Sequence, residues 1–211
     1  MPVTPDRIAL TALELLDQAT IESELTVRAL ASRLGVKAPS LYAHVSGIEE
    51  VIDLLHGHIN AGIDLTLIES STDLDDFKGF IVSYRNAYRA HPLAAAIISN
   101  RGINLDHALN VYEKIAAFLL RAQVAEDKIM PLMALLDSLV LGSSVEPFSA
   151  GFNEPIRWYR KSYPSLAVSL SATSRKAIDE LGFELGVNAY LELVRSHQDS
   201  TQIVRKRRNA S

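Results

Sequence analysis

The sequence predicts an all-α protein with an N-terminal three-helix domain followed by a larger C-terminal helical domain. Apolar residues recur every three or four positions through most of the 211 residues, which is the period of an amphipathic helix. No segment shows the strict apolar and polar alternation of a half-buried strand. Capping residues and prolines stand where the helices would begin, and glycines where several would end.

The signals for the first helices lie close together in the chain. Thr4 caps the first helix and Pro5 takes its first position, where the missing proline N–H costs nothing. Thr26 caps a second helix, which stops at Gly35. Pro39 opens a third helix that must be short, because the capping box at residues 46–49 starts a fourth, expected to run past residue 63. Residues 27–45 therefore hold two brief helices around a tight turn.

The later helices are longer and more apolar. A helix capped by Thr72 or Asp73 should end at His91, because the residue before a proline avoids the helical region. A small apolar segment follows, and Asn104 should start the next helix. Residues 127–145 should form a helix that is apolar nearly all round and must therefore be covered on both sides. Residues 146–171 should form an irregular aromatic connection that folds back onto the core. The last helix should span residues 174–197, with Gly182 and Gly186 one turn apart.

The composition and the residue spacings exclude several classes of function. With 48% hydrophobic residues the chain can bury a substantial core, and with no cysteine it cannot form disulfides, thiolate metal sites or a cysteine nucleophile. Glu14 and Asp17 interrupt the N-terminal segment, which matches neither a signal peptide nor a membrane span. We therefore expect a cytoplasmic protein with no membrane partner. No nucleophile with a base, phosphate loop or metal set stands at a usable spacing, so we expect neither an enzyme nor a cofactor.

The two short helices fit a helix-turn-helix, in which the first helix braces a second that lies in the major groove of DNA. The inward positions would be Leu30, Ala31, Leu34, Val36, Leu41 and Val45, while Ser40, Ala43 and His44 would face outward. The net charge of −4 counts against a nucleic-acid binder. However, residues 25–48 carry Arg28, Arg33 and Lys37 and no acidic residue before Glu49.

The stretch LTVRALASRLGVKAPSLYAHV resembles the DNA-binding domain of the tetracycline-repressor (TetR) family, especially its tetracycline-repressor branch, over residues 5–60. The resemblance implies DNA contacts from ten residues: Thr26, Val27, Arg28, Lys37, Ala38, Pro39, Ser40, Tyr42, Ala43 and His44. Two residues depart from the family pattern, because Ala38 replaces an amide side chain and Ile48 replaces a frequent phosphate-binding lysine. The operator sequence therefore cannot be inferred from the family.

The resemblance also implies a domain order and a ligand site. We expect a helix-turn-helix domain at 1–47, a connecting helix at 48–70, a ligand-binding and dimerisation domain at 71–200, and a basic, disordered tail at 201–211. The pocket candidates are polar or aromatic residues on core-like segments, although any one such residue is more often plain packing: Tyr84, Asn86, Tyr88, Phe118, Asp137, Phe148 and Trp158. His56 and His58 do not predict a metal site, because residues two apart point to different faces of a helix.

A homodimer is expected from the two helices with unusual faces, 127–145 and 174–197, which would form a four-helix bundle across a two-fold axis. The residues chosen for this interface are Leu136, Leu139, Val140, Gly182, Gly186, Ala189 and Leu193. Burial of both helices within one protomer is the alternative.

The sequence thus predicts a homodimeric, ligand-responsive regulator that binds a palindromic operator in double-stranded DNA, most often as a repressor, and is released by a small-molecule effector. The alternative is a helical small-molecule-binding module that no longer binds DNA, favoured by the acidic balance and by Ile48.

Overall fold

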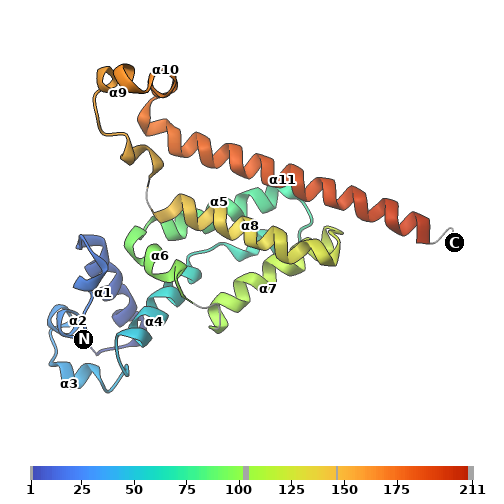
Figure 1. Ribbon diagram of the computed structural model, residues 1–211. Helices are drawn as coiled ribbons and strands as arrows, with labels where there is room; N and C mark the ends of the chain where they lie inside the picture. The colour runs from blue at the N-terminus through green and yellow to red at the C-terminus, as the bar shows by residue number, and fades with distance from the viewer. Residues whose placement is uncertain (1, 102–104, 146, 209–211) are drawn as a thin grey trace.

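The computed structural model describes residues 2–101, 105–145 and 147–208, and in this part of the chain all regular structure is helical. Figure 1 shows a small N-terminal group of helices joined to a larger bundle, with a long C-terminal helix lying along the bundle and extending beyond it. The all-α prediction is confirmed.

The N-terminal group contains α1 (Pro5–Gln18), α2 (Val27–Leu34) and α3 (Ala38–Leu41). Both expected threonine caps form: the Thr4 hydroxyl oxygen accepts from the Arg7 N–H at 3.3 Å, and that of Thr26 accepts from the Ala29 N–H at 3.1 Å. Gly35 ends α2 at φ 72°, a left-handed conformation that glycine adopts without a steric penalty. This turn directs the chain from α2 into α3.

The connecting helix α4 (Ile48–Ala61) packs along α1 and is shorter than expected, because a 3₁₀ turn at Leu65–Ile68 already follows it. Its capping differs from the sequence prediction. The Glu50 carboxylate accepts from the Ser46 N–H at 2.7 Å and from the Ser46 hydroxyl at 2.9 Å, and these bonds lower the pKa of Glu50. Glu49, the residue expected in this role, pairs with Arg101 instead.

The next three helices are α5 (Leu74–Arg89), α6 (Pro92–Ser99) and α7 (Asp106–Arg121). Asp73 caps α5, as one of the two predicted candidates, by accepting from the Asp75 N–H at 2.8 Å. The small apolar segment after His91 proves to be the helix α6. Asn104, the predicted start of the following helix, lies outside the described residues.

The apolar helix α8 (Glu126–Val145) packs against α5, α6, α7 and α11, so its buried face lies at the centre of the bundle. Leu132, Leu136 and Val140 form that face, whereas Met130 and Leu135 on other sides are exposed. The protomer by itself therefore leaves part of this apolar helix uncovered. Of the described helices, α8 alone is long and apolar enough, by length and composition, to cross a membrane.

The aromatic connection forms an arm rather than an irregular segment folded onto the core. A 3₁₀ turn at Phe148–Gly151 leads into α9 (Ile156–Ser162) and α10 (Pro164–Ala172), which project from the body in Figure 1. The reason is local, since α9 and α10 pack on one another and the Tyr159 ring contacts both Phe152 and Trp158. The aromatic residues thus find partners within the arm.

The last helix, α11 (Arg175–Arg208), runs eleven residues beyond the expected end at 197. Residues 201–208 are accordingly helical where a disordered tail was expected, and 209–211 lie outside the described residues. Gly186 allows α11 to approach α8 closely, because a Cβ there would lie 2.7 Å from Cδ1 of Leu139. A Cβ added at Gly182, by contrast, would face open space, with no contact within 4 Å.

Candidate nucleic-acid interface and ligand cavity

The short helix α3 packs on α2; its Leu41 and the later Val45 are buried, whereas its Pro39 and Ser40 are exposed. Tyr42 is 55% exposed, so the alternative that it is a core residue does not apply. Of the ten residues proposed to contact DNA, Val27 and Ala38 are half-buried and eight are exposed: Thr26, Arg28, Lys37, Pro39, Ser40, Tyr42, Ala43 and His44. The inward and outward sides of the motif are as the sequence predicts.

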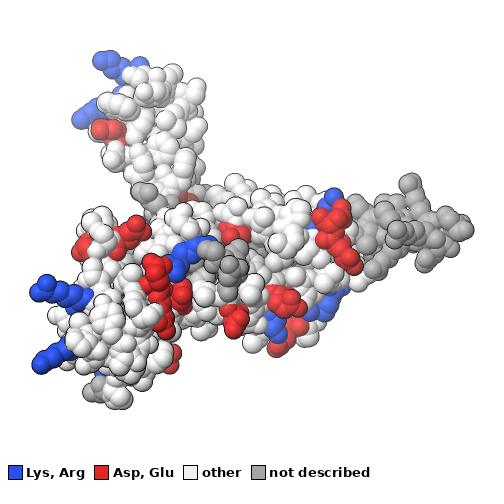
Figure 2. Space-filling view, turned by 60° about the horizontal axis from the view of Figure 1, so that its bottom comes forward, with Lys and Arg blue, Asp and Glu red and all other residues white. Residues whose placement is uncertain are grey.

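Two cations of this region are available to a polyanion. Arg28 and Lys37 are exposed and form no ion pair with any residue in the described parts of the chain, whereas Arg33 lies 3.8 Å from the Glu14 carboxylate. Figure 2 shows basic side chains projecting from the N-terminal domain and from the arm, while acidic side chains gather over the body between them. The positive charge is therefore local, which explains how an acidic chain can offer a basic surface.

A solvent-open groove of about 890 Å³ lies between α7 and α8. Below it, a narrow recess of about 70 Å³ extends toward α4 and α5, and the groove and the recess share Tyr112 and Asp137 in their walls. We call these two spaces together the ligand cavity, with Asp137 at their junction. Helices α4, α5, α6, α7 and α8 all contribute to its walls.

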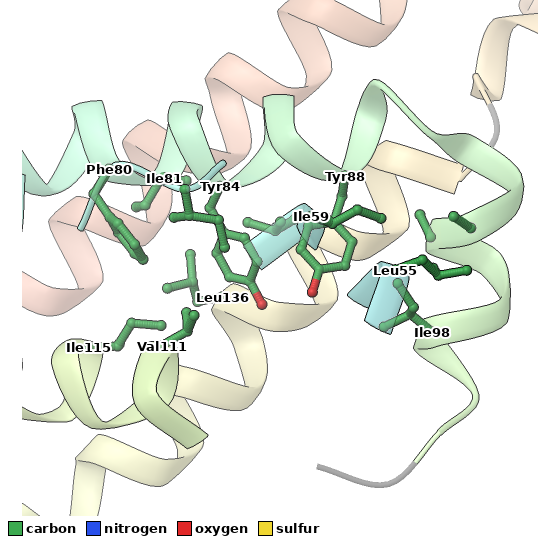
Figure 3. Close-up of a cluster of buried hydrophobic side chains, with 14 of the residues drawn as sticks. Leu55, Ile59, Phe80, Ile81, Tyr84, Tyr88, Ile98, Val111, Ile115 and Leu136 are labelled. Atoms are coloured by element: carbon green, nitrogen blue, oxygen red, sulfur yellow. The ribbon is translucent and has the colours of Figure 1, made fainter. Parts of the chain in front are cut away.

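Asp137 accepts two tyrosine hydrogen bonds on one oxygen. The Tyr84 and Tyr112 hydroxyls donate to its Oδ1 at 3.0 Å and 2.9 Å. Burial and the nearby carboxylate raise the pKa of both phenols, so they remain protonated donors. In Figure 3 the rings of Tyr84 and Tyr88 lie side by side with both hydroxyls pointing away from α5.

A buried polar chain links α4 to α5 and α7 beside the recess. The Tyr88 hydroxyl donates to Oδ1 of Asn60 at 2.7 Å and lies 3.0 Å from Nε2 of His56. The Asn60 amide nitrogen lies 3.1 Å from Nδ1 of His107. Burial, and then the charges of His107 and Arg101, lower the pKa of His56 to about 4, so its imidazole is neutral at pH 7. Sequence reasoning missed these α4 residues, although His56 and Asn60 stand one turn apart on an otherwise apolar face.

The structure brings Tyr84, Tyr88 and Asp137 together but separates the other four ligand-site candidates from the cavity. Phe118 is fully buried and stacks on Phe77 with ring centroids 4.3 Å apart, so it belongs to the core. Asn86 is exposed on another side of α5. Phe148, 69% exposed, lines a separate hollow between α8 and α11, and Trp158 lies on the arm. Their assignment to the cavity is therefore corrected.

Ion pairs connect the cavity to the N-terminal domain. Arg101, which lines the recess, donates to Asp53 on α4 at 2.9 Å and also pairs with Glu49. His91, at the start of α6, lies 2.9 Å from the Asp17 carboxylate on α1. A ligand that displaced α6 would therefore act directly on α1 and α4.

The exposed faces of α8 and α11 carry apolar residues that the protomer leaves uncovered: Leu135, Leu181, Leu185 and Leu193. Gly182 and Ala189, both proposed for the dimer interface, are exposed on the same helix α11. Leu136 and Val140 are buried in the core, and Leu139 packs against Gly186 within the protomer. Leu136 and Val140 are thus committed inside one chain, Leu139 and Gly186 are half-buried, and Leu135, Leu181 and Leu185 are further uncovered apolar residues.

The buried His56 imidazole makes stability depend on pH. The unfolded chain binds a proton at this residue below about pH 6.5, whereas the folded chain does so only below about pH 4. The free energy of unfolding should therefore be highest above pH 6.5 and decrease as the pH falls toward 4, as urea denaturation at stepped pH would measure. His56→Gln should flatten this dependence and His58→Gln, on another face of α4, should not. Equal slopes in the wild type and His56→Gln would contradict the assignment.

No family model matches the chain. An HTH-type transcriptional regulator from Saccharopolyspora erythraea is 33% identical over 141 residues, which are 67% of this chain and 59% of that protein. The HTH-type transcriptional repressor DrrR1 of Streptomyces coeruleorubidus is 24% identical over 148 residues, 67% of this chain and 53% of that protein. The chain thus spans between half and two thirds of the length of these curated relatives.

Solved structures share the fold over nearly the whole chain. The Streptomyces coelicolor TetR family protein ActR, in complex with actinorhodin, superposes with a TM-score of 0.76 at 25% identity, covering 92% of this chain and 96% of that one. TetR from Acinetobacter baumannii gives a TM-score of 0.65 at 21% identity, covering 92% of this chain and 99% of that one. At 21% identity, the similarity to TetR shows a shared fold only.

Proposed function

We propose that this chain, which is similar to HTH-type transcriptional regulators and to the TetR family protein ActR, represses transcription at a DNA operator and is released by a small molecule. The feature that supports DNA binding most directly is α3 with the turn that follows it, where Leu41 is buried and Ser40, Tyr42 and His44 are exposed. These side chains suit the major groove, where hydroxyl and imidazole groups reach base edges and phosphate oxygens.

The operator is expected to be palindromic, because a two-fold homodimer would place two copies of α3 about 34 Å apart, one turn of the DNA helix. The exposed leucines of α8 and α11 support a helical dimer interface, since uncovered apolar faces of this kind mark interaction surfaces. The protein would act in the cytoplasm, where it meets DNA, and without a membrane partner. Its curated relatives are regulators, and we expect no catalytic activity.

The position of the cavity supports release by an effector. Arg101 joins the recess to α4, and α4 packs along α1 of the DNA-binding domain. A ligand that binds one orientation of α4 more tightly would shift the dimer toward a spacing of α3 that does not fit the operator. Binding of actinorhodin by the similar protein ActR supports a small-molecule effector here.

A gel shift with the DNA upstream of the gene tests this function through Arg28, which is exposed and unpaired among the described residues. If Arg28 contacts a phosphate, Arg28→Ala should reduce the slope of log K against log salt by about 1, and if it contacts guanine the loss should be about 1–3 kcal/mol. Arg157→Ala, which removes an exposed arginine from the distant arm, is the matched control and should bind as the wild type does.

The rival function, a small-molecule-binding module without DNA binding, is favoured by the net charge of −4 and by the apolar Ile48. It predicts a gel shift that is absent, or that neither salt nor Arg28→Ala changes. Either of these results would replace the repressor proposal.

A further inference from the structure

The groove between α7 and α8 combines an apolar floor with negative charge. Its walls contain three carboxylates and no lysine or arginine: Asp106, Glu113 and Asp137. The remaining walls are largely apolar, with Leu109, Ala116, Met130, Met133 and Ala134. Methionine side chains adapt to irregular aromatic or aliphatic surfaces. A ligand here would thus meet an adaptable apolar surface surrounded by acidic groups.

The recess below the groove offers a buried hydrogen-bond acceptor at His56. The Tyr88 hydroxyl gives its proton to Asn60, so its oxygen can only accept from the His56 imidazole. Nε2 of the neutral His56 ring therefore carries the hydrogen, and Nδ1 presents a lone pair. His56 is only 7% exposed, and no described residue makes a hydrogen bond to this nitrogen. An unmet buried acceptor is costly, and a donor that arrives with a ligand would satisfy it.

The second acceptor is Asp137, at the junction of groove and recess. The Tyr84 and Tyr112 hydroxyls both donate to Oδ1, and no described residue donates to Oδ2. No lysine or arginine in the described parts of the chain pairs with this carboxylate. Two acceptors, His56 Nδ1 and Asp137 Oδ2, are thus unfilled in the walls of one recess.

Arg101 lies in the recess wall, but its positive charge does not make the recess favourable for an anionic ligand. Arg101 directs its guanidinium to Glu49 and Asp53, and these two carboxylates balance its charge. An anionic ligand would have to break these ion pairs while lying beside Asp137. A ligand that donates hydrogen bonds meets no such cost.

We propose that the effector of this chain is an organic cation with N–H donors and an apolar aromatic body, whose body lies in the groove and whose donor end reaches Asp137 and His56. This assignment rests on the proposed ligand-responsive function, because it names the chemical class that the cavity accepts. The carboxylates of the groove select for positive charge, and the two free acceptors select for donors.

Three acridines separate charge from hydrogen-bond donation. At pH 7, 9-aminoacridine is a cation with N–H donors, 10-methylacridinium is a cation without donors, and acridine-9-carboxylate is an anion. Binding to the full chain, freed of nucleic acid, would be followed by acridine fluorescence. We expect 9-aminoacridine to bind at least tenfold more tightly than the carboxylate, with 10-methylacridinium between them. If acridine-9-carboxylate bound the wild-type chain as tightly as 9-aminoacridine, or more tightly, the proposal would be overturned.

Two substitutions then place the probe in the cavity. Asp137→Asn should weaken binding of both cations at least tenfold, whereas Glu184→Gln, an exposed carboxylate of α11 outside the cavity walls, should leave it unchanged. His56→Phe should weaken 9-aminoacridine more than 10-methylacridinium, because only the first donates a hydrogen bond. Equal effects of Asp137→Asn and Glu184→Gln would overturn the site, and melting curves would establish that each variant is folded.

The same protein in a gel shift keeps the two proposals distinct. Operator binding together with tighter binding of the carboxylate would preserve the regulator and overturn the cationic ligand class. Binding of 9-aminoacridine that Asp137→Asn abolishes, in a protein that shifts no DNA, would support the ligand class and overturn the regulator.

Discussion

Leu185→Glu is expected to hold the protein as a monomer and to weaken operator binding by about 10²–10⁴-fold, the gain that linking two binding modules provides. Leu185 is 71% exposed on α11, and Leu181 and Leu193 are exposed on the same helix. A carboxylate placed at the centre of this apolar face would have to be desolvated twice in a symmetric dimer. Because the side chain is exposed in the protomer, the fold itself should tolerate the change.

Sedimentation and gel shift would measure the two parts of this expectation on the same samples. Leu120→Glu is the matched control, because Leu120 is a 47% exposed leucine on α7, outside the exposed faces of α8 and α11. It should remain dimeric and bind the operator. If the Leu185→Glu protein still sediments as a dimer, the dimer interface must lie on another face of the protomer.

Phe118→Ala is expected to lower the free energy of unfolding by about 3–5 kcal/mol, the usual cost of removing a large aromatic side chain from a core. Phe118 is fully buried and stacks on Phe77, which in turn stacks on Phe80. For a chain of this size the melting temperature should fall by roughly 6–20 °C. Thermal and urea denaturation would measure both quantities.

Leu120→Ala, two residues further along the same helix, is the control for Phe118→Ala. Its exposed side chain should contribute within about 0.5 kcal/mol. If Phe118→Ala were instead as stable as the wild type but failed to bind ligand, Phe118 would be a cavity residue, as the sequence pattern indicated, and its place in the core would be refuted.

The N-terminal part of the molecule could be derived from the sequence in detail. Thr4, Thr26 and Gly35 act on backbone groups within four residues of themselves, so their effects are local and readable. The outward side of α3 followed in the same way, because Leu41 and Val45 are the apolar positions that must face α2. Even here the choice between Glu49 and Glu50 as the partner of Ser46 needed the structure, since Arg101, 52 residues away in the chain, draws Glu49 to itself.

The cavity could be predicted only in part. Tyr84, Tyr88 and Asp137 are polar or aromatic groups on core-like segments, a pattern that predicts a pocket, and they do line one recess. Phe118 and Trp158 fit the same pattern and lie elsewhere, the first in the core and the second on the arm. An aromatic ring satisfies the same sequence pattern in a core, in a cavity wall and on a projecting hairpin, so the pattern cannot separate these places.

By itself the sequence determined the all-helical class and the two short helices around the Gly35 turn, because periodicity, caps and turns depend on neighbours along the chain. Only the tertiary structure decided which face of each helix is buried, where the arm points and which polar groups meet at Asp137. Those outcomes depend on packing between residues far apart in sequence. Leu136 and Leu135 are adjacent in the chain, yet one belongs to the core and the other to the surface.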